Sequence, residues 1–164
     1  WSALYLFEDK GIVIQEAVMG VMLFNGTMCI GRLLGNTIGK HVTSKQVVVG
    51  GYLLGAIAMA FIVFLPGHAS MYTYLLLGIS LAMVVPNLFS AMGEQNVIPM
   101  TQAVATSTML GYMGILMGPA LIGFIAHGTS LTIAFIVLTA LLVISTGIGK
   151  YAYHLMSKDC GLEE

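Results

Sequence analysis

The chain has 164 residues, of which 58% are hydrophobic and 8% are charged, and its mean hydropathy is +0.95. Because soluble domains carry roughly a quarter charged residues, this composition excludes an ordinary soluble domain and predicts a protein of membrane-spanning helices. The formal net charge of -1 provides no basic surface for nucleic acid, so no nucleic-acid partner is expected.

Six apolar segments follow one another along the chain. Residues 1–7 are apolar and aromatic but too short to cross about 30 Å of hydrocarbon, so they predict the end of a helix. Because the first residue is Trp1, we expect this helix to be truncated and the chain to start inside a longer protein. Five later segments are long enough to span a bilayer: 16–36, 47–65, 70–92, 103–126 and 130–149. The predicted fold is therefore all-α, a polytopic transmembrane helix bundle in which residues 1–164 form one domain.

The distribution of Lys and Arg predicts the orientation. If the spans alternate in direction, five of the six basic residues fall on one side, and Lys10 falls on the other. Basic residues in short loops mark the cytoplasmic side. We therefore expect a multi-pass protein of the cytoplasmic (inner) membrane, with residues 150–164 as a cytoplasmic tail and His68 and His127 outside. The five residues on the cytoplasmic side are Arg32, Lys40, Lys45, Lys150 and Lys158.

Polar residues mark one face of the first complete span. Asn25, Cys29, Arg32 and Asn36 are spaced by four, three and four residues, which places them on one face of a helix. Polar side chains inside lipid usually face protein or a wet cavity. Since Arg32 is near the cytoplasmic end, a role as an interface anchor or a clamp between helices is favoured over direct contact with a solute. On an adjacent face, a helix-packing surface is predicted from Thr27, Gly31, Gly35 and Gly39.

The third span contains a proline followed by an amide. Pro86 permits a kink, and Asn87 shares a face with Ser80 and Ser90. Asn87 is a candidate for solute binding at mid-depth. The alternative is a structural hydrogen bond from Asn87 to a neighbouring helix.

The fourth span carries a stripe of small residues. Gly111, Gly114 and Gly118, followed by Pro119, predict a surface on which another backbone can pack closely. Tyr112 lies beside the stripe, where its hydroxyl could reach a cavity or its ring could simply fill the core. The second and fifth spans have almost no polar side chain at mid-depth, so we expect them to face lipid.

No catalytic or metal-binding pattern is present in the sequence. The four histidines lack the spacing of metal ligands, and no nucleophile–base pair or phosphate-binding loop is found. We therefore expect neither an enzyme nor a bound metal or cofactor.

Two stretches carry a family resemblance. Residues 31–36, with the basic residues that follow up to Lys45, resemble the cytoplasmic loop motif of the major facilitator superfamily. Residues 1–6 resemble the end of the seventh helix in the fucose-permease-like branch, and residues 111–123 resemble its eleventh helix. Two positions depart from the motif: Asn36 stands where many members carry an acid, and Thr43 stands near where glycine is common.

The resemblance implies the carboxyl-terminal half of a twelve-helix secondary transporter, with a missing amino-terminal half upstream of Trp1. Such a protein moves a small polar solute, such as a sugar, by alternating access, and a proton is a common coupling ion. The expected cytoplasmic gate loop contains Gly31, Arg32 and Gly35. The rival interpretation is a five-span membrane scaffold or assembly protein without a transport cycle. The candidate substrate-binding residues are Trp1, Tyr5, Asn25, Asn87 and Tyr112.

Overall fold

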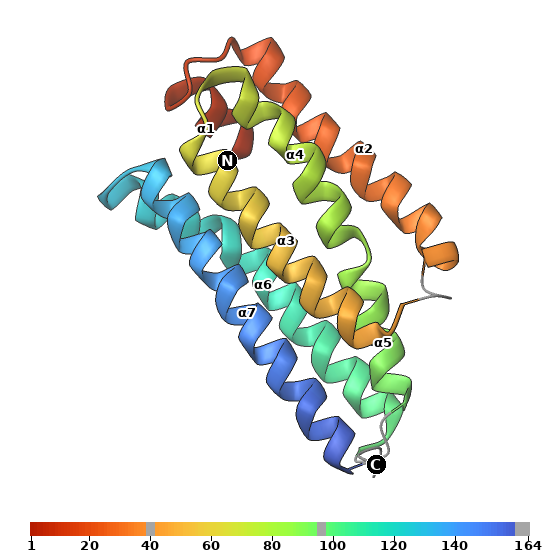
Figure 1. Ribbon diagram of the computed structural model, residues 1–164. Coiled ribbons are helices and arrows are strands. Elements are labelled where there is room, and N and C mark those ends of the chain that lie inside the picture. Colours follow the sequence, from red (N-terminus) through yellow and green to blue (C-terminus); the bar gives the residue numbers. More distant parts are fainter. Residues whose placement is uncertain (39–41, 95–97, 160–164) are drawn as a thin grey trace.

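The computed structural model describes residues 1–38, 42–94 and 98–159, and these residues form helices joined by short connections (Figure 1). No strand occurs in these ranges. Five segments are long and apolar enough to cross a membrane, which confirms the predicted all-α bundle of spanning helices. The helices are α1 (Ser2–Glu8), α2 (Ile14–Ile38), α3 (Ser44–Phe64), α4 (Gly67–Ala82), α5 (Val84–Glu94), α6 (Met100–Gly128) and α7 (Leu131–Asp159).

The ends of several helices differ from the ends of the apolar runs. α3 begins at Ser44, ahead of the apolar run that starts at Val47, because polar residues can form the first turn of a helix. There the Thr43 backbone N–H donates to the Gln46 side chain at 3.4 Å, part of a capping box. α7 continues to Asp159, so the first ten residues of the predicted tail are helical.

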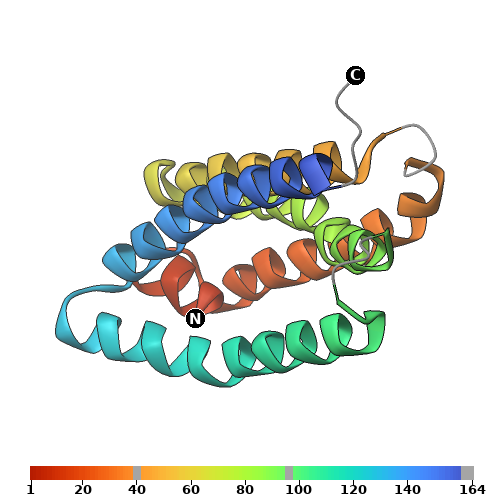
Figure 2. The same cartoon turned by 90° about the horizontal axis from the view of Figure 1, so that it is seen from below.

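Four helices lie side by side in the order α2, α4, α3 and α7 (Figure 1). The short helix α1 packs on α2, and α6 lies along another side of the bundle with contacts to α5 and α7 (Figure 2). Ala103 is the one buried residue described in α6. Most residues of α6 are exposed, and it is the least buried of the five spanning segments in the described chain.

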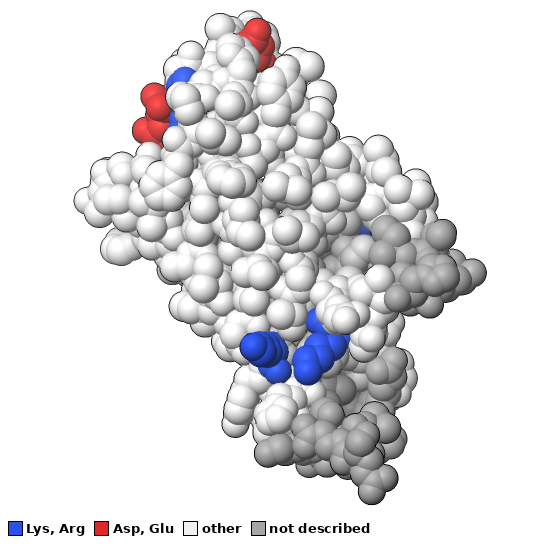
Figure 3. Space-filling view, in the orientation of Figure 1, with Lys and Arg blue, Asp and Glu red and all other residues white. Residues whose placement is uncertain are grey.

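Charged side chains divide between the two ends of the bundle (Figure 3). Glu8, Asp9 and Glu16 lie at the connection between α1 and α2, here called the acidic end. Lys45 at the start of α3 and Lys150 in the last part of α7 lie at the opposite, basic end. Lys10 is at the acidic end, whereas Lys40 and the side chain of Lys158 lie outside the described residues. Which end faces the cytoplasm remains a prediction.

Large side chains fill the core near the acidic end. Tyr5 of α1 stacks on Phe135 of α7, with ring centroids 4.2 Å apart and ring planes 15° apart. Ile62 at the end of α3 and Tyr74 near the start of α4 are buried in the same cluster. All these residues lie in the helix turns closest to the acidic end, so side-chain packing is concentrated there.

Small residues bring α4 into contact with its two neighbours. A Cβ atom added at Gly31 of α2 would lie 2.6 Å from the Ala82 Cβ, and one added at Gly78 would lie 2.5 Å from the Phe24 carbonyl oxygen. On the other side of α4, a Cβ at Gly51 of α3 would lie 2.7 Å from the Ser80 carbonyl oxygen. Since real Cβ atoms do not approach other atoms this closely, glycine is what permits the observed helix separations.

The expectation that the second span faces lipid describes only one side of α3. Phe61 and Phe64 are exposed, but Gly51, Ala58 and Ile62 are buried against neighbouring helices. The sequence does not reveal the packed face because that face consists of glycine, alanine and aliphatic residues rather than polar ones.

Candidate functional site

The third span is broken into two helices. α4 ends at Ala82, Met83 adopts a turn, and α5 starts at Val84. In a continuous helix the backbone N–H of residue 86 would donate to the Ala82 carbonyl. Pro86 has no N–H, and its ring crowds that carbonyl, so the break falls one turn before the proline. Gly35 near the end of α2 lies against Met83. The break is therefore closer to the basic end than the mid-depth position expected from the sequence.

Asn87 holds the first turn after the break. Its side-chain Nδ2 donates to the Met83 carbonyl at 2.8 Å, and its backbone N–H donates to the same oxygen at 3.2 Å. The side chain is 8% exposed. The hydrogen bond thus lies within the α4–α5 unit itself, rather than joining a neighbouring helix as one sequence interpretation expected.

A pocket of about 430 Å³ lies between α5 and α6. Tyr112 lines it and is 64% exposed, and the side chains of Ser107 and Thr108 supply two further hydroxyl groups. None of the described residues that line the pocket is charged, which suits apolar groups that carry a few hydrogen-bonding atoms. The remaining lining residues are Val85, Leu88, Phe89, Met92, Gly111 and Ile115.

The structure does not bring Asn87 and Tyr112 together. Asn87 is buried on the same side of α5 as Val84 and Ala91, at spacings of three and four residues. Pocket-lining residues such as Leu88 lie about 100° or more around the helix from Asn87, given 3.6 residues per turn. In this conformation the amide faces the bundle, and the tyrosine faces the pocket.

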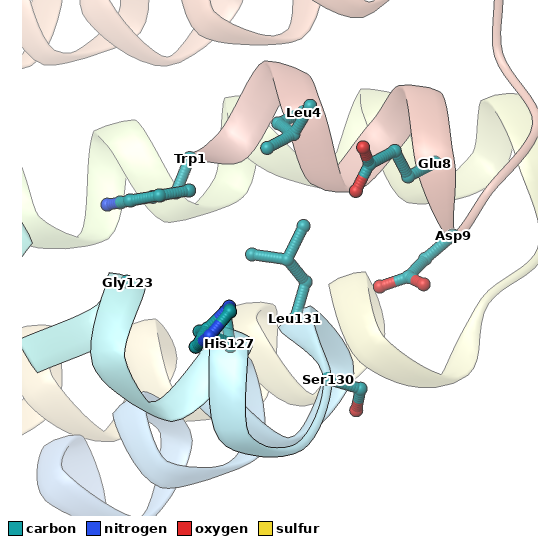
Figure 4. Close-up of a pocket in the computed structure, with 9 residues that line it drawn as sticks. Trp1, Leu4, Glu8, Asp9, Gly123, His127, Ser130 and Leu131 are labelled. Atoms are coloured by element: carbon teal, nitrogen blue, oxygen red, sulfur yellow. The ribbon is translucent and has the colours of Figure 1, made fainter.

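Trp1 lies beside α6 at the edge of a second pocket. Its indole Nε1–H donates to the Pro119 carbonyl at 3.0 Å, and a Cβ atom at Gly123 would lie 2.9 Å from the indole ring. The pocket has a volume of about 380 Å³ and opens at the acidic end. Figure 4 shows Glu8 and Asp9 on one side of it and His127 on the other.

Tyr5 lies in the core and lines none of these pockets. Its side chain is fully buried, and its ring is stacked on Phe135. A solute could reach Tyr5 only if α1 and α7 separated.

The polar face of α2 is open. Asn25, Cys29 and Arg32 are all exposed, so the helices of the described chain leave this face uncovered. The Asn25 amide nitrogen donates to the Val21 carbonyl at 2.8 Å, and an Arg32 guanidinium nitrogen lies 3.6 Å from the Met28 sulfur. Neither residue contacts another helix through a hydrogen bond, and the side chain of Asn36 lies outside the described residues.

The two sets of predicted packing glycines have different surroundings. Gly31 and Gly35, which belong to the predicted gate loop, lie within α2 and contact α4 at its break. By contrast, a Cβ atom at Gly111, Gly114 or Gly118 would meet nothing within 4 Å. Pro119 lies inside α6 and accepts the Trp1 hydrogen bond through its carbonyl. The partner expected for the α6 stripe is therefore not among the described residues.

Lys10 is a structural residue that sequence reasoning missed. Its ammonium donates to the Val63 and Leu65 carbonyls, at 2.6 and 2.9 Å, and so caps the end of α3. Burial lowers the pKa of Lys10, an effect that the nearby Asp9 carboxylate opposes. One feature of the sequence could have drawn attention to Lys10: it is the one basic residue expected on the non-cytoplasmic side of the membrane.

Among the described residues, no group of three His, Cys, Asp or Glu side chains is placed to hold a metal.

Five apolar spanning helices, one of them broken inside the bundle, define a polytopic helical membrane protein. Its relatives are named as transporters or membrane proteins. The chain is 40% identical over 136 residues to an uncharacterised MFS-type transporter of Yersinia pestis, covering 82% of this chain and 35% of that protein. The chain is therefore similar to a protein named as an MFS-type transporter, which is the superfamily that residues 31–36 resemble.

Two further relatives are more distant. The membrane protein MosC of Rhizobium meliloti is 29% identical over 88% of the chain, and an uncharacterised transporter of Sinorhizobium fredii is 26% identical over 84%. The chain spans about a third of the length of these curated relatives, 35% to 37% in each case. No family model and no solved structure matches the chain.

Proposed function

We propose that this chain is the carboxyl-terminal half of a secondary transporter that moves a small polar solute across the cytoplasmic membrane by alternating access. The observation that carries the proposal is the break at Met83, which makes α5 a separate half-helix that forms one wall of the α5–α6 pocket. Broken helices inside a membrane bundle are typical of transporter binding sites. The names of the relatives support the same class of protein.

The uncovered faces of α2 and α6 support a second half as the partner. Asn25 and Arg32 on α2, and the glycine stripe on α6, have no covering helix in the described chain. Polar groups and small residues on spanning helices normally face protein or a wet cavity rather than lipid. An amino-terminal half that covers both faces would enclose a solute pathway between the halves.

Within this proposal the residues have distinct roles. Tyr112 and Trp1 contact the solute from the two pockets, and Asn25 contacts it from the open face of α2. Asn87 and Tyr5 are reached only when the helices move. Gly31, Arg32 and Gly35 act at the cytoplasmic gate, where the glycines let α2 slide along α4 at its break.

The test is solute uptake by the intact protein reconstituted in liposomes. Tritiated D-glucose, D-mannitol, myo-inositol and glycerol serve as neutral polyhydroxylated probes, each with and without an inward proton gradient. We expect uptake of at least one probe above protein-free liposomes, and faster uptake with the gradient if a proton is coupled. Tyr112→Phe should reduce that uptake, whereas Tyr72→Phe, an exposed tyrosine of α4, is the matched control. Absence of uptake for all four probes would count against the proposed class of solute.

A further inference from the structure

Tyr74 is a buried hydroxyl-bearing residue for which the fold supplies no partner. Its side chain is 2% exposed, and its hydroxyl has no hydrogen bond within the described residues. The Ser2 side chain is close enough to interact with this hydroxyl, but no hydrogen bond of good geometry joins them. A buried polar group without a partner is costly, so such a group is expected to have one in the working protein.

A cavity of about 70 Å³ lies beside the Tyr74 side chain, between α1, α2 and α4. It is lined by Ser2, Val21, Phe24, Tyr74 and Leu77. A cavity needs only roughly 10–15 Å³ to admit a water molecule, so a small polar group fits beside the tyrosine. Gly78, one turn further along α4, holds this helix against Phe24 and so fixes the wall of the cavity.

The cavity lies inside the bundle, near its acidic end. Tyr74 lies seven residues after the start of α4, and Val21 lies seven residues after the start of α2. At 1.5 Å per residue this is about 10 Å from the acidic end, well inside the bundle. Side chains from α1, α2 and α4 all line the cavity.

The lining also restricts what can bind. Ser2 and Tyr74 contribute two hydroxyls and the other three lining residues are apolar, so none of the described residues that line the cavity is charged. A charged group would enter without a counter-charge, which is strongly unfavourable. A tyrosine hydroxyl both donates and accepts hydrogen bonds, so it matches a neutral group that can do the same.

We infer that the cavity between α1, α2 and α4 binds a neutral hydroxyl group through Tyr74, and that Tyr74 thereby helps to select the solute. The inference deepens the proposed transport function and rests on it where the hydroxyl belongs to a solute. The same chemistry could be supplied by a resident water molecule. The neighbouring Tyr5 hydroxyl is likewise buried; the Thr132 side chain is close enough to interact with it, but no hydrogen bond of good geometry joins them within the described residues.

The experiment compares thermal unfolding of the intact purified protein with that of Tyr74→Phe, which removes one oxygen atom and keeps the ring. Tyr72→Phe is the matched control, because Tyr72 is 58% exposed and two residues away. Ser2→Ala, which removes the other hydroxyl that lines the cavity, is a second variant should Tyr74→Phe fold poorly. Each protein is measured in solute-free buffer and over a concentration series of D-glucose, D-mannitol, myo-inositol and glycerol.

If a solute supplies the hydroxyl, at least one probe stabilises the wild type and Tyr72→Phe. Tyr74→Phe then needs about 5- to 150-fold more of that probe for the same stabilisation. If water supplies it, no probe acts, and Tyr74→Phe unfolds at a lower temperature than Tyr72→Phe in solute-free buffer. The inference is overturned if Tyr74→Phe unfolds at the same or a higher temperature and no probe distinguishes it from the control.

These outcomes are separable from the transport proposal because thermal unfolding requires no transport. Loss of probe uptake with a preserved difference between Tyr74→Phe and Tyr72→Phe would reject transport and keep the binding site. Uptake that is equal in all variants, with no thermal difference, would keep transport and reject the role of Tyr74.

Discussion

Gly35 of α2 lies directly against Met83, the residue at which the third spanning segment breaks. One turn earlier in α2, Gly31 meets Ala82 in the same way. The two glycines of the loop motif therefore touch the point where α4 ends and α5 begins. Glycine is required at both positions for this contact, because neither has room for an added methyl group.

A first prediction concerns this contact. Gly31→Leu should lower the free energy of unfolding by several kcal/mol or prevent folding, because the new side chain would overlap Ala82. Gly26→Leu is the matched control in the same helix, since nothing lies within 4 Å of its Cβ position. Both variants are heated in detergent, and the fraction that stays folded at each temperature is measured by size-exclusion chromatography. Equal behaviour of the two variants would show that α2 and α4 are not in contact here.

A second prediction concerns the hydrogen bond that follows the break. Asn87→Ala removes the side-chain donor to the Met83 carbonyl and should cost about 1 kcal/mol of stability. Ser90→Ala, which removes an exposed hydrogen bond to Pro86, should cost less. If Asn87 also contacts solute after α5 moves, its alanine variant should lose about 5- to 150-fold in affinity for the transported probe. Binding and thermal unfolding measured on the same preparations separate these two roles.

A third prediction concerns the uncovered stripe of α6. Gly114→Leu should reduce uptake by the intact protein if another part of the protein packs on the stripe. Gly147→Leu in α7 is the control, because both positions are free of neighbours within 4 Å in the described chain. A difference between the two variants must then arise from contacts outside these residues. Similar uptake and similar protein levels would leave the α6 stripe without a packing role.

A fourth prediction concerns orientation. In a background without native cysteines, His68→Cys should react with an impermeant thiol reagent added to intact cells, and Val42→Cys should not. Both positions are exposed and lie at opposite ends of the bundle, so a reagent present on the correct side can reach either one. The opposite labelling pattern would invert the topology deduced from the basic residues.

The sequence predicts the helical segments well because long apolar runs have few alternatives. It also indicates a distortion near Pro86, since proline removes a specific backbone donor. The sequence does not show that the break falls at Met83 or that Asn87 turns away from Tyr112, because both depend on how α5 sits between α3 and α6. Tyr74 could not be singled out either, since the cavity beside it is formed by residues from three helices.

The structure of the acidic end also depends on contacts between distant residues, which the periodicity of the sequence does not reveal. Lys10 finds its carbonyl partners more than fifty residues away, at the end of α3. Trp1 likewise finds its partner Pro119 at a separation of 118 residues along the chain. A pattern read along one helix predicts which residues share a face, but it does not predict which helix covers that face.

The concentration of large side chains near the acidic end has a mechanical consequence. The stacked rings of Tyr5 and Phe135 must separate before α1 and α7 can part at that end, whereas α2 and α4 meet near the basic end through small residues such as Gly31 and Ala82. We infer that the bundle is stiffer near its acidic end than near its basic end. We expect backbone amides of α5 to exchange with deuterium faster than those around Ile62, because the helices would separate more readily at the basic end than at the acidic end.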